Sequence, residues 1–258
     1  MKASWISDIG KVREQNEDTV FTDTDKGIFL LADGMGGAAG GEIASSLAVR
    51  AACDFLGDQL ALAEPASIPR LLADALASAH SALSRKSQEE PELAGMGTTL
   101  EILVVKGMEA FICHVGDSRV YLMQNDALEQ LTTDDNMASL LLAEHVTPEE
   151  IPPRARHILT QAVGASDTLI PEVRTVALQP KDVLLLCSDG LTGMLSDREM
   201  GEIIRRHRSD LDGAAAALVR TANDRGGYDN VSLILVDPTP VPDEVLLLED
   251  LTENTPRQ

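Results

Sequence analysis

Residues 28–41 read IFLLADGMGGAAGG, an apolar run that ends in a carboxylate and continues into a glycine-rich segment. The apolar residues predict a short buried strand, and a helical pattern follows the glycines. Asp33 therefore stands at the end of a strand, where glycines let an ion or ligand approach the main chain closely. An Asp-Gly pair at this place is also ordinary turn chemistry. The stretch by itself leaves both interpretations open.

Two later stretches repeat this pattern. AFICHVGD covers residues 110–117 and VLLLCSDG covers residues 183–190, so Asp117 and Asp189 also follow apolar strands. Three strands that each end in a carboxylate are difficult to explain by turns alone. If the strands before Asp33 and Asp189 run antiparallel to the strand that begins after Asp229, these side chains meet at one edge of a sheet. The sequence therefore predicts a cluster of acidic residues.

Such a cluster needs either protons or a cation, since like charges at short range raise each other's pKa. Glu17 or Asp18, from a polar run near the N-terminus, can supply a fourth carboxylate, and Gly34 can add its main-chain carbonyl. A set of oxygen donors without nearby histidine or cysteine selects Mg²⁺ or Mn²⁺ over zinc. Two such ions about 3.5–4 Å apart can share a hydroxide and clamp a phosphoryl group. With Arg13 as a fork for phosphate oxygens, the pattern predicts phosphate-ester hydrolysis.

The composition bounds the class of protein. The chain has 258 residues, 44% of them hydrophobic, which suffices for a core in one or two domains. Its 42 acidic against 21 basic residues give a formal charge of -21, which disfavours nucleic acid and anionic membranes as partners, although solubility alone explains the excess. Cys53, Cys113 and Cys187 lie in apolar runs, as reduced core thiols of a cytosolic protein do. Without a signal sequence or an apolar span of about 18 residues, we expect a cytoplasmic monomer.

Hydrophobic periodicity predicts an α+β fold with antiparallel sheets and helices packed outside them. Strands are expected at residues 98–105, 110–123 and 127–133, as one antiparallel meander, and later at 171–178, 182–190 and 230–236. Amphipathic helices are expected at residues 39–60, 68–86, 197–207 and 210–224. Residues 134–164 are polar and broken by prolines, so we expect short helical pieces and a functional role there. We predict a catalytic domain over residues 1–237 and a loosely ordered acidic tail over residues 238–258.

Six short motifs follow one another along the chain. They are RxxxED at 13–18, LADGMGG at 31–37, GTT at 97–99, VGDSRVY at 115–121, CSDGL at 187–191 and DNVS at 229–232. In order and spacing they resemble the metal-dependent protein phosphatases of type 2C, most closely the short bacterial members, over residues 4–237. The resemblance implies a central sandwich of two antiparallel β-sheets flanked by helices on both sides. It also implies hydrolysis of phosphoserine and phosphothreonine in proteins, opposite a bacterial serine/threonine kinase in signalling.

The resemblance further implies roles for individual residues. The two core ions, Mn²⁺ or Mg²⁺, would be held by Asp33 as the bridge, by Asp189 and Asp229 on one ion, and by Glu17 or Asp18 with the Gly34 carbonyl on the other. Arg13 would bind the substrate phosphate. Asp117, together with Asp189, would hold a third ion. Residues 134–164 correspond to a mobile flap.

Two departures from the family pattern matter. Many relatives, chiefly eukaryotic ones, have a histidine directly after the Asp-Gly pair, whereas this chain has Met35, so the acid that protonates the leaving group stays open. The flap begins with TDDN at residues 133–136, where Asp-His-Ser is common among bacterial members. Contacts of the flap can therefore not be transferred from the family.

Two other motifs and one rival class compete with this interpretation. Residues 34–39, GMGGAA, fit the GxGxxA pattern of dinucleotide binding, with Asp54 beyond it, but no parallel strand is predicted to follow soon enough. Residues 113–119, CHVGDSR, fit the CxxGxxR pattern of cysteine-dependent phosphatases, but Asp117 would repel the phosphate and a strand continues where a helix should begin. A catalytically inactive domain that binds phosphopeptides is the rival class. The presence of every expected metal carboxylate favours the enzyme.

Three further polar residues have structural interpretations. We expect Arg119 to form an ion pair with Asp117 or Glu101, without a catalytic role. We expect His114 and His157 to be structural histidines whose hydrogen bonds are satisfied, although His157 belongs to the flap.

Overall fold

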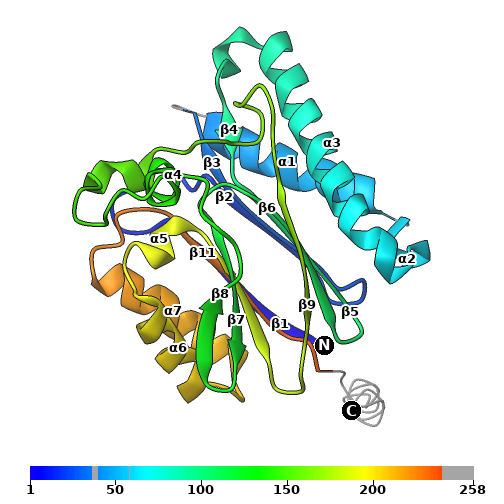
Figure 1. Ribbon diagram of the computed structural model, residues 1–258, viewed down its shortest axis with the longest axis vertical. Helices are drawn as coiled ribbons and strands as arrows, with labels where there is room; N and C mark the ends of the chain where they lie inside the picture. The colour runs from blue at the N-terminus through cyan, green and yellow to red at the C-terminus, as the bar shows by residue number, and fades with distance from the viewer. Residues whose placement is uncertain (37–39, 58, 240–258) are drawn as a thin grey trace, which may run out of the picture.

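Three strands of this protein are nearly continuous apolar runs because both of their faces are covered: Leu100–Lys106, Val183–Cys187 and Val231–Asp237. The computed structural model describes residues 1–36, 40–57 and 59–239. In these residues, two antiparallel sheets pack face to face and helices cover both outer surfaces (Figure 1). The predicted α+β sandwich is confirmed.

The first sheet has the strand order β1-β11-β10-β7-β8. Its strands are β1 (Lys2–Asp8), β7 (Arg119–Gln124), β8 (Ala127–Gln130), β10 (Val183–Cys187) and β11 (Val231–Asp237). All neighbouring strands are antiparallel. The turn between β7 and β8 places Asn125 and Asp126 at φ of 50° and 64°, the conformation of a tight hairpin turn.

The second sheet has the strand order β2-β3-β5-β6-β9, and the short β4 pairs with β3. Its strands are β2 (Asp18–Asp23), β3 (Ile28–Met35), β4 (Gly97–Thr98), β5 (Leu100–Lys106), β6 (Glu109–Val115) and β9 (Glu172–Ala177). In the pairing of β2 with β3, Asp18 lies directly opposite Asp33. Residues that oppose each other across two strands share a face of the sheet, so these two acidic residues are neighbours.

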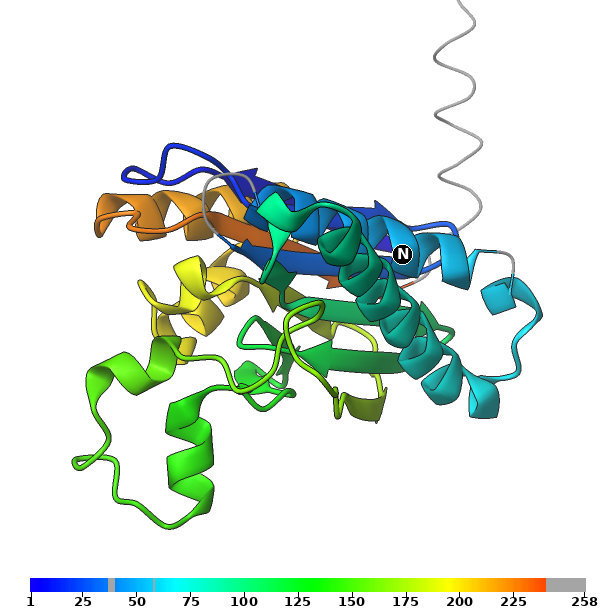
Figure 2. The same cartoon turned by 90° about the horizontal axis from the view of Figure 1, so that it is seen from above.

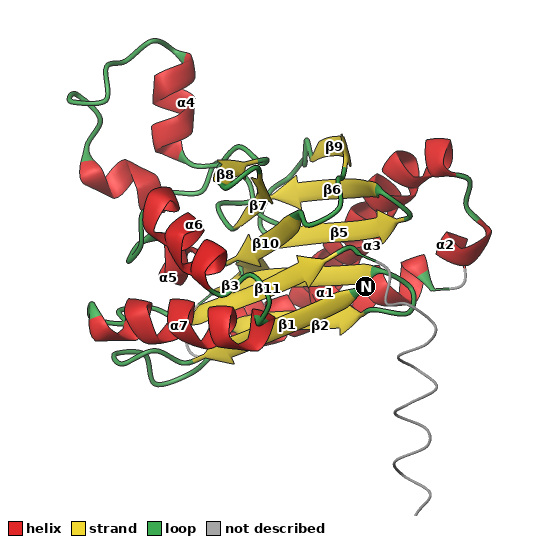
Figure 3. Ribbon diagram, turned by 90° about the horizontal axis from the view of Figure 1, so that it is seen from below, coloured by secondary structure: helices red, strands yellow, loops and turns green. Residues whose placement is uncertain are grey.

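The helices form the two outer layers, as Figures 2 and 3 show from above and below. Helices α1 (Gly40–Leu56), α2 (Gln59–Leu62) and α3 (Ile68–Glu89) accompany the second sheet, together with the short turns η1 (Pro65–Ser67) and η2 (Pro91–Leu93). Helices α5 (Asp189–Thr192), α6 (Asp197–Arg206) and α7 (Leu211–Asp224) accompany the first sheet. Helix α6 begins at a capping box of Ser196 and Glu199. Across the described ranges, every helix is too short or too polar to traverse a lipid bilayer.

The core consists of three apolar layers. The layer between the sheets contains Phe29, Leu31, Leu103, Ile112, Leu184, Leu186, Ile234 and Val236. A second layer joins α1 and α3 to one sheet, and a third joins α6 and α7 to the other. Burying a leucine or isoleucine side chain contributes on the order of 1.5–3 kcal/mol, so these layers hold the strand ends firmly in place.

The meander predicted for residues 98–133 is wrong, because its strands belong to two sheets. Strand β6 pairs with β5 and β9, whereas β7 pairs with β8 and β10. The chain crosses from one sheet to the other at Gly116, whose φ of 120° suits glycine. A Cβ at this position would lie 2.5 Å from Thr99 Cγ2. The crossing therefore depends on a close approach of two backbones that strand periodicity does not reveal.

Residues 134–164 form the predicted flap. They contain the helix α4 (Met137–Ala143) and the turn η3 (Pro153–His157), and no strand longer than an isolated bridge. Figure 2 shows this segment, in light green, projecting from the edge of the sandwich. The predicted short helical pieces are therefore confirmed. Of the predicted tail, residues 240–258 lie outside the described residues.

Candidate metal centre and active site

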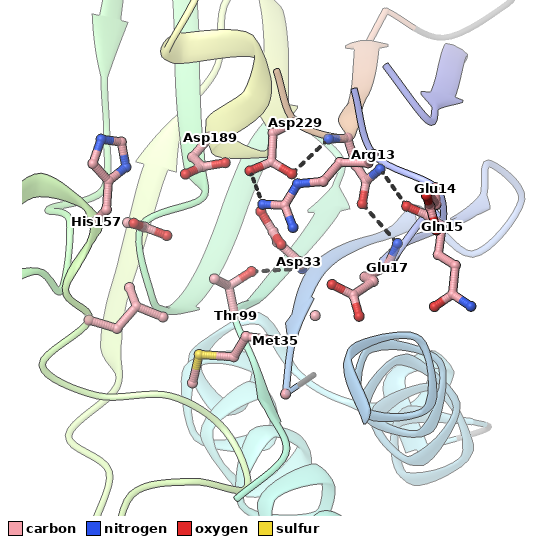
Figure 4. Close-up of a pocket in the computed structure, with 15 residues that line it drawn as sticks. Arg13, Glu14, Gln15, Glu17, Asp33, Met35, Thr99, His157, Asp189 and Asp229 are labelled. Carbon is pink, nitrogen blue, oxygen red and sulfur yellow. Dashed lines mark hydrogen bonds and ion pairs between the residues drawn. The ribbon is translucent and has the colours of Figure 1, made fainter. Parts of the chain in front are cut away.

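A cavity of about 860 Å³ opens where strand ends from both sheets meet (Figure 4). It is lined by the loop after β1, the end of β3, the turn after β6, the start of α5, the loop before β11 and part of the flap. The cavity brings together the predicted residues Arg13, Glu17, Asp33, Gly34, Asp117, Asp189 and Asp229. The remaining predicted residue, Asp18, is buried beside Asp33 and does not line the cavity.

The carboxylates meet across the two sheets, which corrects the prediction of a single sheet edge. Asp33 belongs to β3 in the second sheet, whereas Asp189 and Asp229 flank the paired strands β10 and β11 in the first. Ser188 joins the sheets, because its Oγ donates to Asp18 Oδ2 at 2.8 Å and accepts from the Ser232 N–H at 3.0 Å. The convergence was predicted correctly, but it depends on sheet packing.

The main chain of Asp33 is held by the GTT motif. The Asp33 N–H donates to Thr99 Oγ1 at 2.9 Å. The Asp33 carbonyl accepts from Thr98 Oγ1 at 2.8 Å and from the Thr99 N–H at 2.9 Å. With its main chain fixed on both sides, Asp33 presents its carboxylate to the cavity (Figure 4).

Asn230 holds the N-terminal loop against the start of β11. Its side-chain amide donates to the carbonyls of Ile9 and Gln15, at 3.0 and 2.9 Å, and its Oδ1 accepts from the Glu17 N–H at 2.9 Å. Asn230 is buried, so these bonds are shielded from water. Sequence reasoning quoted this residue in the DNVS motif but assigned it no role. The structure shows that Asn230 fixes the main chain of Glu17 at the cavity.

Glu17 and the Gly34 carbonyl converge at Gly41, the second residue of α1. A Cβ at Gly41 would collide with Glu17 Oε1 and would lie 2.9 Å from the Gly34 carbonyl oxygen. Only glycine leaves room for both oxygens, which therefore form a pair of donors at the edge of the cavity. This geometry favours Glu17 over Asp18 as the partner of Gly34.

Asp18 lies beneath the cavity. One of its oxygens, Oδ2, accepts from Ser188, whereas Oδ1 is buried without a hydrogen-bond partner among the described residues. Burial raises the pKa of Asp18 to about 7, against hydrogen bonds from Ser232 and Ser188 that lower it. An orphaned buried carboxylate oxygen is costly unless it finds a proton or a cation.

Asp33, Asp117 and Asp189 also have raised pKa values. Burial raises the pKa of Asp33 well above its usual value, and the charges of Asp18 and Asp189 raise it further. Burial and the charge of Asp189 raise the pKa of Asp117 to about 8, and the pKa of Asp189 is raised by burial and by Asp229. The protein thus gathers acidic groups that repel one another, and a divalent cation would relieve that repulsion.

Arg13 is the basic residue nearest this cluster. Its Nη2 lies 2.7 Å from Asp229 Oδ2, with side-chain exposures of 48% and 34%. Among the described residues, no three acidic, histidine or cysteine side chains already stand at the spacing of a complete metal ligand set. The donors nevertheless fit a hard cation, because they are all oxygens. Arg13 forms an ion pair with the Asp229 carboxylate, which such a cation would also need as a ligand.

Arg119 forms a different ion pair from the predicted one. Its Nε and Nη2 each donate to a carboxylate oxygen of Asp134, both at 2.8 Å, and its Nη1 donates to the Tyr121 hydroxyl at 2.9 Å. The predicted partners, Asp117 and Glu101, are therefore wrong. The sequence could not reveal this pair, because the crossing at Gly116 sets which side of β7 faces the flap. The fork of Arg119 anchors the first residue of the flap.

The prediction of structural histidines holds for one of the two. His114 is fully buried, with Nδ1 2.8 Å from Glu101 Oε1 and Nε2 3.0 Å from the Thr133 carbonyl oxygen. His157 is instead exposed at the end of η3 and lines the cavity with Asp33 and Asp189. The prediction is wrong for His157, because the fold of the flap, which the sequence pattern does not show, brings this residue back to the cavity.

The two competing motifs lose their chemical basis in the structure. Cys113 is buried within β6, and burial raises the pKa of its thiol to about 12, so it does not supply a thiolate nucleophile. Residues 37–39 of the GMGGAA motif lie outside the described residues, and Asp54 lies within α1. The strands next to β3 are antiparallel to it, whereas dinucleotide binding uses a parallel sheet.

Comparison with known proteins agrees with this site. The family model described as protein phosphatase 2C matches residues 11–230. The serine/threonine phosphatase Stp of Listeria innocua is 37% identical over 242 residues, which are 92% of this chain and 96% of that protein. The protein phosphatase PhpP of Streptococcus pneumoniae is 36% identical over 244 residues, 92% of this chain and 97% of that protein.

Solved structures give the same result. The crystal structure of the Mycobacterium tuberculosis serine/threonine phosphatase PstP/Ppp has a TM-score of 0.82 and 34% identity, and covers 92% of this chain and 97% of that one. The catalytic domain of PstP in complex with two manganese ions has a TM-score of 0.80 and 33% identity, over 92% and 97% of the two chains.

The fold and the acidic cavity define a phosphatase, and the chain belongs to the protein phosphatase 2C family. Within that family it is similar, along 92% of its length, to bacterial serine/threonine phosphatases such as Stp and PhpP. The predicted family and the predicted class, a metal-dependent phosphoprotein phosphatase, are therefore confirmed.

Proposed function

We propose that this protein hydrolyses phosphoserine and phosphothreonine side chains of other proteins at the cavity around Asp33. The observation that carries the proposal is the convergence of Asp33, Asp189 and Asp229, from two sheets, in one cavity, where burial and neighbouring carboxylates raise the pKa of Asp33 and of Asp189. Three negative charges gathered in one cavity repel one another, and divalent cations bound there would relieve that repulsion. Among relatives, the PstP catalytic domain was solved with two manganese ions.

The residues present fit two core ions. Asp33 would contact both, with Asp189 and Asp229 on one ion and Glu17 with the Gly34 carbonyl on the other. Asp18 would stabilise the cluster from below through its unpartnered oxygen. When bound, Mn²⁺ or Mg²⁺ supplies a nucleophile at neutral pH and neutralises phosphoryl oxygens. Asp117, which faces Asp189, would hold a third and weaker ion.

Arg13 would change partners during binding. In the structure it neutralises Asp229 at 2.7 Å. If Asp229 held a cation, its carboxylate would no longer need the Arg13 guanidinium as a counter-charge. The guanidinium is left to form a bidentate fork on two phosphate oxygens, an arrangement that fixes the phosphoryl group for in-line attack. Arg13 therefore orients the substrate. Asp33, Asp189 and Asp229, which form the floor of the cavity, set the position of attack.

The experiment measures hydrolysis of a phosphothreonine peptide after chelation and after return of Mn²⁺ or Mg²⁺. We expect activity to vanish on chelation and to return with either ion, and calorimetry to detect metal binding that Asp33→Asn weakens. The matched control is Glu92→Gln, an exposed carboxylate on η2 away from the cavity. Full activity in the chelated protein would overturn the proposal.

We also propose that a serine/threonine kinase makes the products that this phosphatase removes, and that the protein is cytoplasmic and monomeric. A phosphoproteome compared with and without the phosphatase would identify the sites on which the two enzymes act, because such sites gain phosphate when the phosphatase is removed.

A further inference from the structure

The side chain at position 35 of the cavity is a thioether. Met35 follows Gly34 at the end of β3 and lines the cavity (Figure 4). Its Cε packs against Gly97, where an added Cβ would lie 2.9 Å from it. A thioether has no proton to give. Yet a serine or threonine alkoxide is a poor leaving group and needs a proton as the phosphate bond breaks.

The other groups of the cavity offer few alternatives. Asp33, Asp189 and Asp229 are the proposed ligands, and Arg13 has a raised pKa because of its hydrogen bond to Asp229. Thr99 Oγ1 is engaged by the Asp33 N–H and by Ser118. His157 is the imidazole among the residues that line the cavity.

His157 also lies on the side of the cavity toward which a bound peptide would extend. It lines a second cavity of about 650 Å³ under the flap, which Leu142, Pro148 and Ile151 make partly apolar. The two cavities share Asp117, His157 and Asp189. A phosphopeptide seated on the acidic floor would extend its chain into this second space. The oxygen that leaves belongs to the peptide, so it lies on the His157 side of phosphorus.

The flap holds His157 in place through main-chain bonds. The Met137 N–H donates to the Ile158 carbonyl at 2.8 Å, and the Thr160 N–H donates to the Asp135 carbonyl at 2.8 Å. Asp135 in turn is bonded to Gly116, beside Asp117, because the Gly116 N–H donates to Asp135 Oδ2 at 3.0 Å. The position of the imidazole is thus coupled to the turn that carries Asp117.

Charged groups from several elements face the space around His157. Asp189 on α5 is close enough for the imidazole charge to lower the pKa of that carboxylate, although burial outweighs the effect. Asp117 faces the same space from the turn after β6. Arg156 opposes them from η3, and the Arg119 guanidinium is neutralised by Asp134.

We propose that His157 is the catalytic acid that protonates the leaving oxygen, in place of a residue at position 35. The inference rests on the proposed function. As the bond between phosphorus and Oγ breaks, its electron pair stays on Oγ and takes the proton of the imidazolium. The serine or threonine leaves as a neutral alcohol. Phosphorus keeps its new bond to the attacking oxygen and leaves as inorganic phosphate, and the neutral imidazole regains a proton from water.

The experiment compares two peptides of the same sequence that carry phosphothreonine or phosphotyrosine, with p-nitrophenyl phosphate as a third substrate. An aryl oxygen leaves without protonation, whereas the threonine oxygen does not. We expect His157→Asn to lower kcat for phosphothreonine on the order of 10²-fold, the lower end for general acid catalysis. Both aryl substrates should stay within about twofold. The alkaline decline of kcat with phosphothreonine should disappear in the variant.

The matched control is His145→Asn, an exposed histidine of the same flap that does not line either cavity. It should leave all three substrates unchanged. Met35→His in the His157→Asn background should restore part of the phosphothreonine rate. A readout independent of turnover is the imidazole ¹⁵N shift of His157, which should move when inorganic phosphate is added to the Mg²⁺-loaded protein and should not move for His145.

Each contrary result has a separate meaning. Equal losses on phosphothreonine and phosphotyrosine peptides would assign His157 to peptide binding and overturn the proton-transfer role. Unchanged rates on every substrate would leave water as the acid and also overturn it, while the proposed function would stand. Absence of hydrolysis by the wild-type protein with Mn²⁺ or Mg²⁺ would overturn the proposed function itself, and the inference with it.

Discussion

Two carboxylates of neighbouring antiparallel strands have opposite surroundings. Glu101 on β5 is fully buried and has His114 at 2.8 Å, whereas Asp33 on β3 is surrounded by Asp18, Asp117, Asp189 and Asp229. Thr99 lies between the two, because its Oγ1 accepts from the Asp33 N–H at 2.9 Å and is 3.5 Å from Glu101 Oε2. Both are acidic residues in low-dielectric surroundings. Of the two, Glu101 alone lies beside a side chain of this protein, that of His114, which can carry the compensating positive charge.

The carboxylate of Glu101 has a structural role, whereas the carboxylate of Asp33 has a functional one. His114 Nε2 must carry a proton, since its partner, the Thr133 carbonyl, can only accept. The proton between Nδ1 and Glu101 then completes an imidazolium and carboxylate pair. Burial raises the pKa of Glu101 to about 7, and the bond to Glu101 raises that of His114 to about 9 despite burial. Glu101 is satisfied within the fold, whereas Asp33 needs a cation from solution.

The largest effect is expected at Asp33. Asp33→Asn removes the proposed bridge, so kcat should fall by more than about 10³-fold, beyond the loss for one oxyanion donor. The same change should raise the melting temperature of the metal-free protein, because it relieves repulsion with Asp18 and Asp189. Glu101→Gln should do the reverse to stability and lower the melting temperature. Equal melting shifts in both variants would abolish the distinction between the two carboxylates.

Asp117 comes next, as the proposed ligand of a third ion. Asp117→Ala should lower turnover on the order of 10- to 100-fold, a typical effect for a group outside the central ligand set. Binding of the two core ions should change little. Titration calorimetry with Mn²⁺ measures this directly, and loss of the core ions in Asp117→Ala would mean that Asp117 belongs to the central cluster.

The buried pair should give stability a pH dependence. The His114 pKa of about 9 lies above the value of about 6.5 for a histidine in an unfolded chain, so the folded protein keeps a proton that the unfolded chain releases. The contribution is complete below pH 6.5 or so, and the free energy of unfolding falls as pH rises from about 6.5 to about 9. Urea unfolding of the Mg²⁺-loaded protein tests this. His114→Gln should flatten the slope in that interval, and an unchanged slope would place the proton elsewhere.

The smallest effect is expected from the C-terminal segment. Deleting residues 240–258 should leave peptide hydrolysis within about twofold, because a segment beyond the last strand contributes little to the core. A fall of several degrees in melting temperature would instead indicate that the apolar VLLL stretch at residues 245–248 packs on the domain.

The acidic cluster of the cavity could be predicted from the sequence, whereas two residues that position it could not. The strands that end at Asp33 and Asp189 and the strand that begins after Asp229 were sufficient to predict one acidic cluster, but the packing of two sheets, and not a single sheet edge, brings these side chains together. Asn230 and Gly41 were not assigned roles, because a buried amide that binds carbonyls and a glycine that makes room for Glu17 have no local pattern.

By itself, the sequence determined the strands, most of the helices, the acidic cluster and the family, because periodicity and short motifs are local properties of the chain. Only the tertiary structure decided which sheet each strand joins, that Arg119 holds Asp134, and that His157 returns to the cavity. These outcomes depend on the crossing at Gly116 and on main-chain bonds between distant segments of the flap. Contacts between residues that are far apart in the sequence are set by packing in three dimensions, so local sequence patterns do not predict them.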